Sequence, residues 1–244
     1  MQTDQSYFSF SYGLITTTGE GELGVYASGL NTTAHLNAVV VQNKDTDLAF
    51  GLVAQDEAVV TASFVNYSSN STGTCGFVAD GGEITVSDST AVARGPDSSI
   101  FCSFASDAVN TLSEIHAQDV VAYSGNGPIA VLLGNTYLAA FTNSSFSSGG
   151  DAAIISSSVG VEVLSDTVLH TTSTQIKATH PDAPVLLFTL KDIYATLHLT
   201  ELIPSASNVL LRAACDASAM EGDCNQFRVS TLVSESTISG DIQA

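Results

Sequence analysis

The chain of 244 residues has few basic side chains: Lys and Arg together number 6, against 25 Asp and Glu, and the formal net charge is −19. Proteins that bind nucleic acids need a basic surface to neutralise phosphates, and anionic membranes attract basic segments. Long apolar runs are also absent, because the longest, such as "APVLLFTL", fall far short of the ~20 residues that span a bilayer. We therefore expect no nucleic-acid partner and no membrane insertion.

Tryptophan is absent, Pro occurs only five times, and charged residues make up 13% of the chain. The charged fraction is about half of the ~25% typical of soluble domains, so other polar groups must cover the surface. The 57 Ser and Thr residues supply them. The lack of Trp argues against carbohydrate-active proteins, which stack sugars on large aromatic rings, but seven Tyr remain for that purpose.

The sequence is a succession of short β-branched or aromatic runs separated by Gly, Asn, Asp or Ser. In "SYFSFSYG", for example, an extended chain places Phe8, Phe10 and Tyr12 on one face and Ser9 and Ser11 on the other. Turns recur at intervals of about 8–12 residues, as in sandwiches and barrels, and the helical crossovers typical of parallel sheets are missing. We predict one all-β domain over residues 1–244, an antiparallel β-sandwich of jelly-roll type.

Two features qualify this prediction. Evenly spaced Gly and Ser over residues 125–158 suit the tight turns of stacked coils, so a β-solenoid is the alternative fold. We expect at most one or two short helices, the first in "SDAVNTLSEIHAQ" over residues 106–118, where Ser106 suits an N-cap. The segment "FTLKDIYATLHLTELIP" fits a helix or a strand, and its alternation over eight residues favours the strand.

The four cysteines form an even set, which predicts disulfides and an oxidising compartment. Pairing by proximity along the chain joins Cys75 to Cys102 and Cys215 to Cys224, and no spacing suits a zinc site. No secretory signal opens the sequence, so we expect either a mature secreted protein or a particle-surface protein released by another route. The Asn-x-Ser/Thr motif, which permits glycosylation, occurs at Asn31, Asn66, Asn70 and Asn143.

Residues that could carry chemistry are few. Asn43, Asp45 and Asp47 alternate as in the first half of a calcium loop, but Leu48 and Ala54 occupy the positions where an EF-hand requires Gly and Glu. A polar turn is the better interpretation, so we expect no cofactor and keep a looser calcium site as the alternative. The five histidines are scattered singly, and no nucleophile motif is present.

These observations favour a non-enzymatic structural or surface protein of an extracellular, virion or cell-surface assembly. Its edges carry little of the Lys and Pro that normally block β-pairing, so we expect self-association through β faces and edges, as a homo-oligomer or with assembly partners. The alternative, from another class, is a secreted carbohydrate-active enzyme or a lectin-like module that binds glycans. Because no catalytic motif is present, we favour a protein that is not an enzyme.

Overall fold

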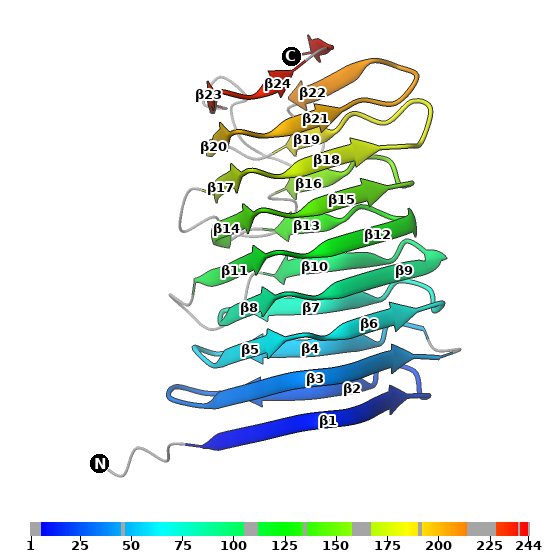
Figure 1. Ribbon diagram of the computed structural model, residues 1–244, viewed down its shortest axis with the longest axis vertical. Coiled ribbons are helices and arrows are strands. Elements are labelled where there is room, and N and C mark those ends of the chain that lie inside the picture. Colours follow the sequence, from blue (N-terminus) through cyan, green and yellow to red (C-terminus); the bar gives the residue numbers. More distant parts are fainter. Residues whose placement is uncertain are drawn as a thin grey trace, which may run out of the picture.

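The computed structural model describes residues 6–44, 47–104, 112–133, 136–157, 167–189, 192–213, 228–238 and 240–243. These residues form a parallel β-solenoid, in which successive coils of the chain stack from β1 at one end to β25 at the other (Figure 1). Each coil contributes one strand to a nine-stranded sheet and, in most coils, two strands to a sixteen-stranded sheet. We call them sheet B and sheet A.

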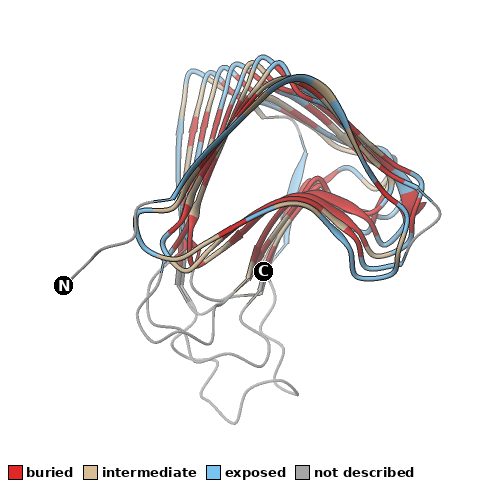
Figure 2. Ribbon diagram, turned by 90° about the horizontal axis from the view of Figure 1, so that it is seen from below, coloured by how far each residue is buried: buried red, intermediate tan, exposed pale blue. Residues whose placement is uncertain are grey.

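In most coils the chain turns sharply between its two strands of sheet A, so that sheet A is folded into two halves, which we call its first and second limbs. Sheet B forms the third side of the cross-section (Figure 2). The strands of sheet B are β2 (Leu23–Ser28), β4 (Phe50–Gln55), β7 (Cys75–Asp80), β10 (Ser99–Phe104), β13 (Ala130–Leu133), β16 (Ile154–Ser157), β19 (Leu186–Thr189), β22 (Val209–Ala213) and β25 (Asp241–Gln243). In sheet A, two long strands run through both limbs: β1 (Tyr7–Thr17) and β3 (Thr33–Asn43).

The other strands of the first limb of sheet A are β5 (Val59–Ser63), β8 (Glu83–Ser87), β11 (Ser113–Gln118), β14 (Thr136–Thr142), β17 (Thr167–Thr172), β20 (Asp192–His198) and β23 (Arg228–Ser234). Those of the second limb are β6 (Asn66–Ser69), β9 (Thr90–Pro96), β12 (Val121–Asn126), β15 (Ser145–Ser148), β18 (Gln175–Ala178), β21 (Glu201–Ile203) and β24 (Thr237–Ile238).

The prediction of an antiparallel sandwich or jelly roll is wrong, and the alternative, the β-solenoid, is supported. Strands that follow one another in sequence do not pair; β5 pairs in parallel with β3 and β8, one coil away on either side. Parallel neighbours need a connection of a dozen or more residues. The lack of helical crossovers in the sequence argues against parallel pairing, but in a solenoid the remaining strands of the coil supply the connection.

The prediction of a helix over residues 106–118 is also wrong where it can be checked, because Ser113–Gln118 form strand β11 and residues 105–111 lie outside the described part. Ile115 and Ala117 point into the core, and their alternation with polar residues is the period of a strand. The strand preferred for the later ambiguous segment is confirmed by β20, in which Ile193, Ala195 and Leu197 are buried.

The bend between the limbs of sheet A is made by one residue per coil with positive φ, and together these residues form a row along the solenoid. The row consists of Tyr12, Ala38, Phe64, Asp88, Asp119, Asn143, Ser173, Leu199 and Glu235. In several coils the next residue carries a hydroxyl group. Ser89, for example, accepts a hydrogen bond from the Val65 amide of the preceding coil at 2.9 Å and donates one to Ser87 O, at the end of β8 in its own coil. The hydroxyls therefore join coils as well as face solvent.

Hydroxyl residues also dominate the buried polar groups. Eighteen of the nineteen buried polar side chains of the described part are Ser or Thr. At a second corner of the coil, Ser98 and Ser124 donate to carbonyls of the coil beside them, Ser71 O at 2.7 Å and Ser98 O at 2.8 Å. A short side chain that satisfies backbone groups at a tight corner explains part of the Ser and Thr content, in addition to the surface role that the composition predicts.

One buried phenol is held against sheet B. The Tyr67 ring lies beside Gly51 and Gly76, where an added Cβ would come within 2.8 Å of ring carbons. Its hydroxyl accepts a hydrogen bond from Asn43 Nδ2 at 3.2 Å, and Asn43 Oδ1 accepts one from Thr17 Oγ1 at 2.7 Å. Burial raises the pKa of Tyr67 to about 12.

This pKa predicts a loss of stability in alkali. An unfolded tyrosine has a pKa near 10, so between about pH 10 and pH 12 the unfolded chain releases the Tyr67 proton while the folded chain keeps it. The contribution of the buried, protonated Tyr67 to the free energy of unfolding is therefore fully present below about pH 10. About 3 kcal/mol of it is lost as the pH rises to about 12. Urea unfolding at stepped pH should show this decline, and the variant Tyr67→Phe should lack that part of it. Equal pH dependence of both proteins would contradict the assignment.

Candidate functional site

The outer face of the first limb of sheet A carries side chains in rows that follow the register of the strands. One row reads His35, Thr61, Thr85, His116, Ala140, His170 and Thr196, each the register partner of the next. The row beside it reads Thr33, Val59, Glu83, Glu114, Leu138, Val168, Tyr194 and Ser230. Three histidines that are scattered in the sequence thus share one row.

Two glutamates occupy neighbouring positions in the middle of this face. Glu83 and Glu114 are register partners on β8 and β11, so they occupy equivalent positions in adjacent coils, where neighbouring strands lie about 4.8 Å apart. Thr85 Oγ1 donates to Glu83 Oε1 at 3.1 Å, and His116 Nε2 lies 3.2 Å from Glu114 Oε2. We call Glu83, Thr85, Glu114 and His116 the outer cluster.

The outer cluster is accessible and its side chains are oriented by one another. The side chains of His116 and Glu114 are about one third exposed, at 34% and 35%. Each carboxylate uses one oxygen in the contact with its neighbour on the same strand. An ionised carboxylate has about four acceptor positions, so acceptor capacity remains on both glutamates for hydroxyl or amine donors of a ligand.

A β-bulge places an exposed aromatic residue in the strand next to this cluster. Between Ser113 and Glu114 the register with β14 shifts: Ser113 pairs with Thr136 and Glu114 with Leu138. Tyr137 is the extra residue, and it is 47% exposed. Bulges redirect side chains at functional sites, and this one places an exposed ring directly before the partner of Glu114.

The predicted disulfides and sequons lie elsewhere. Cys75 and Cys102 form a disulfide on the outer side of sheet B, among Val53 and Val78. Cys215 and Cys224 lie outside the described residues. The four sequon asparagines, Asn31, Asn66, Asn70 and Asn143, are all exposed, and their glycosylation stays a prediction.

The candidate calcium ligands do not converge as far as the structure describes them. The Asn43 side chain is buried in contact with Thr17 and Tyr67, whereas Asp47 is exposed and Asp45 lies outside the described residues. In the described part of the chain, no group of three or more His, Cys, Asp or Glu side chains is placed to hold a metal ion. The same part contains no helix long and apolar enough to cross a membrane.

The sequence reasoning missed the outer cluster altogether. Glu83, Glu114 and Tyr137 were not singled out, and His116 was assigned to a helix. The spacing that relates equivalent positions is irregular: Val59, Glu83, Glu114 and Leu138 are separated by 24, 31 and 24 residues. A repeat search that allowed insertions after the strands of sheet B could have aligned the two glutamates. No family model, no curated protein and no solved structure matches this chain.

Proposed function

We propose that the protein is a lectin-like module that binds glycans on the outer face of sheet A, centred on the outer cluster and Tyr137. The observation that carries this proposal is the register pairing of Glu83 with Glu114 beside the exposed ring on the bulge. Paired carboxylates accept hydrogen bonds from neighbouring sugar hydroxyls, and charge-assisted bonds of this kind are the strong ones. A tyrosine ring covers the apolar C–H face of a pyranose and offers a hydroxyl at its edge.

The charge of the molecule narrows the class of glycan. A net charge of −19 and two glutamates at the centre of the site repel uronic acids and sulfated sugars. Neutral glycans and amine-bearing glycans meet no such repulsion, and an amine gains attraction from the carboxylates. The regular repeat of the outer rows along the solenoid suits an extended chain of sugar units better than a single sugar.

Binding fits this face better than hydrolysis. Glycoside hydrolysis needs one carboxyl group held as an acid and a second at a set distance across the bond to be cleaved. Glu83 and Glu114 both lie on an open sheet face, and two cavities of the described part lie at the ends of the solenoid instead. The arrangement therefore offers acceptors and an aromatic surface, which are the elements of recognition.

The test is calorimetric titration with neutral, amine-bearing and uronate oligosaccharides. The variants Glu114→Gln and Tyr137→Ala should each weaken binding by about 5- to 150-fold, since a charged hydrogen bond or a stacked ring is worth about 1–3 kcal/mol. Matched controls are Glu201→Gln and Tyr123→Ala, which change exposed residues of the second limb and should leave affinity unchanged. Equal losses of affinity in variants and controls would overturn the proposal. Release of new reducing ends from the oligosaccharides would also overturn it, because it would show that the protein hydrolyses glycans.

A further inference from the structure

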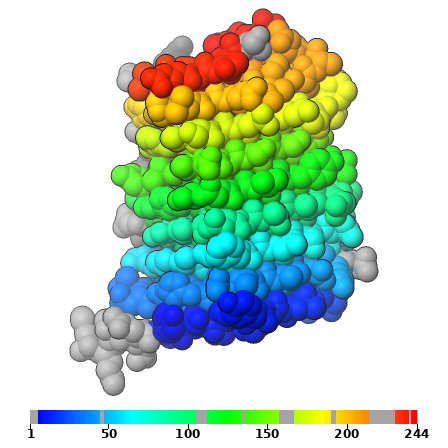
Figure 3. Space-filling view, in the orientation of Figure 1, coloured from blue at the N-terminus to red at the C-terminus, as the bar shows by residue number. Residues whose placement is uncertain are grey.

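Both ends of the solenoid present unpaired strand edges within the described residues. At one end β1 pairs only with β3, and β2 only with β4; we call this the β1 end. At the other, β23, β24 and β25 each pair with one strand of the preceding coil; we call this the β25 end. Figure 3 shows these ends as the blue and red layers that bound the stack.

As far as the described residues go, the two strands at the β1 end carry no charge or proline that would prevent association. Strand β1 is 11 residues long, "YFSFSYGLITT", and contains no charged residue and no proline, and β2, "LGVYAS", has none either. Proteins protect such edges with lysine, proline, bulges or a covering segment. A long, uncharged edge is a template on which another strand can pair.

Both ends also expose the apolar cross-section of the core. At the β1 end the core-facing Phe8 is 48% exposed, and at the β25 end Val233 is 43% and Ile242 71% exposed. The β25 end contains a cavity of about 260 Å³, and nine of its ten lining side chains are apolar. The cavity marks the place where the side chains of a further coil would pack.

The register shows what would fill that place. Phe8 is the register partner of Ala34, and successive register partners form a row of core-facing residues that runs through the coils to Thr231 of β23. Phe10 begins the neighbouring core-facing row, which ends at Val233 of β23. If the β1 end of a second copy continued both sheets, the rings of Phe8 and Phe10, which stack at 6.4 Å, would lie over the cavity.

We propose that the β1 end of one copy docks on the β25 end of another, so that the chains associate head to tail and both sheets continue across the contact. This contact is heterologous, so it leaves a free end on each side and builds an open filament. A contact between two β25 ends would instead place two cavities against each other, and none of the described residues that line them supplies an aromatic side chain to fill either. The proposal is independent of glycan binding, which uses the side of the solenoid.

The test uses the full chain and two variants, each with one end blocked by charge. Phe8→Lys blocks the β1 end and Ile242→Asp blocks the β25 end; both side chains are partly exposed, and circular dichroism checks that each variant folds. Sedimentation and electron microscopy should show filaments of the wild type, while each variant alone should have the mass of one chain, 25.2 kDa. The control Tyr123→Lys, on the outer face of β12, should assemble as the wild type does.

Mixing the two variants gives the decisive result. Phe8→Lys keeps its β25 end and Ile242→Asp keeps its β1 end, so a one-to-one mixture should form a dimer of about twice the chain mass and grow no further. A wild type that stays monomeric at all concentrations would overturn the proposal. The same holds if the two ends are covered by a different protein instead of by a second copy. Filaments formed by either variant alone, or a mixture that stays monomeric, would also overturn it.

Discussion

Replacing Gly95 by alanine should destabilise the protein by at least about 4 kcal/mol, a loss that single substitutions rarely reach. A Cβ on Gly95, at the end of β9, would lie 1.7 Å from the Ser71 carbonyl oxygen and 2.4 Å from its carbon, in the coil next to it. These are backbone atoms, so no side-chain rotation relieves the overlap. The two coils would have to move apart at a corner where strand spacing is set by hydrogen bonds at about 4.8 Å.

A matched control exists one coil away. Gly125 lies on β12 opposite the end of β9, between the register pairs of Ser124 with Ala93 and Asn126 with Pro96. A Cβ there would meet its nearest atom at 3.6 Å, an ordinary contact. Gly125→Ala should therefore change the free energy of unfolding by less than about 1 kcal/mol, with a small gain from the stiffer unfolded chain. Urea unfolding of both variants checks the pair, and similar stabilities would contradict the proposed role of close coil contact.

The sequence pattern was sufficient to find the strands but not their partners. Alternation marks which residues point inward, and Val60 and Ala62 of β5 or Ile193 and Ala195 of β20 are buried as expected. Parallel and antiparallel packing place the same residues inside, so alternation cannot tell them apart. The evenly spaced Gly and Ser over residues 125–158 were the signal for the solenoid, because corners such as Gly127, where a Cβ would lie 2.1 Å from Ser98 O, accept only glycine.

The candidate site was harder to predict than the fold. Glu83 and Glu114 are 31 residues apart, and nothing local distinguishes either from a solvated surface carboxylate. They become neighbours only through the register of β8 with β11, a property of the stacked coils. Tyr137 is placed beside the partner of Glu114 only by the β-bulge in β14, and no pattern in the sequence predicts that bulge. The Asn43, Asp45 and Asp47 motif is the opposite case. Its alternation in the sequence suggested a calcium site, but the Asn43 side chain is buried in the core.

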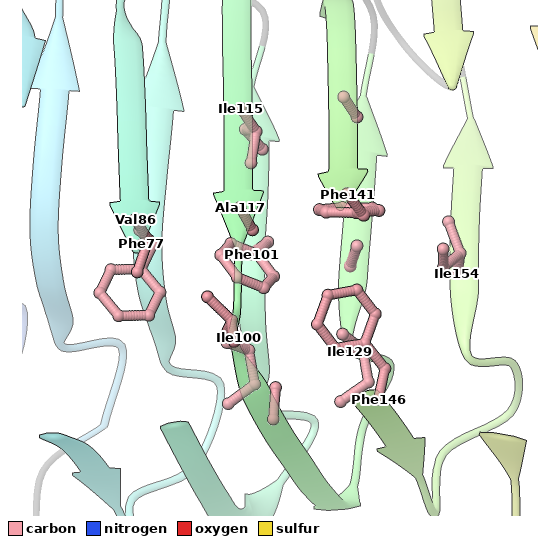
Figure 4. Close-up of a cluster of buried hydrophobic side chains, with 14 of the residues drawn as sticks. Phe77, Val86, Ile100, Phe101, Ile115, Ala117, Ile129, Phe141, Phe146 and Ile154 are labelled. Carbon is pink, nitrogen blue, oxygen red and sulfur yellow. The ribbon is translucent and has the colours of Figure 1, made fainter. Parts of the chain in front are cut away.

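Removing the Phe101 ring should cost about 4 kcal/mol, within the range of ~3–5 kcal/mol for Phe to Ala in a core. Phe101, on β10, is fully buried and lies at the centre of a group of aromatic rings (Figure 4). Its ring centroid is 5.4 Å from that of Phe77, 5.5 Å from Phe141 and 5.9 Å from Phe146. These contacts join sheet B to both limbs of sheet A, so the cavity left by alanine would separate three walls of the coil at once.

The matched control is Phe64→Ala, at the bend of the next-but-one coil. Phe64 is 60% exposed, so its truncation should cost less than about 1 kcal/mol. Both variants are compared by urea unfolding, where the midpoint of Phe101→Ala should fall while the slope stays that of the wild type. A small loss at Phe101 would mean that the stacked backbone ladders, rather than the aromatic group, hold the walls together. In that case Gly95→Ala, which separates the ladders directly, would remain the most damaging substitution.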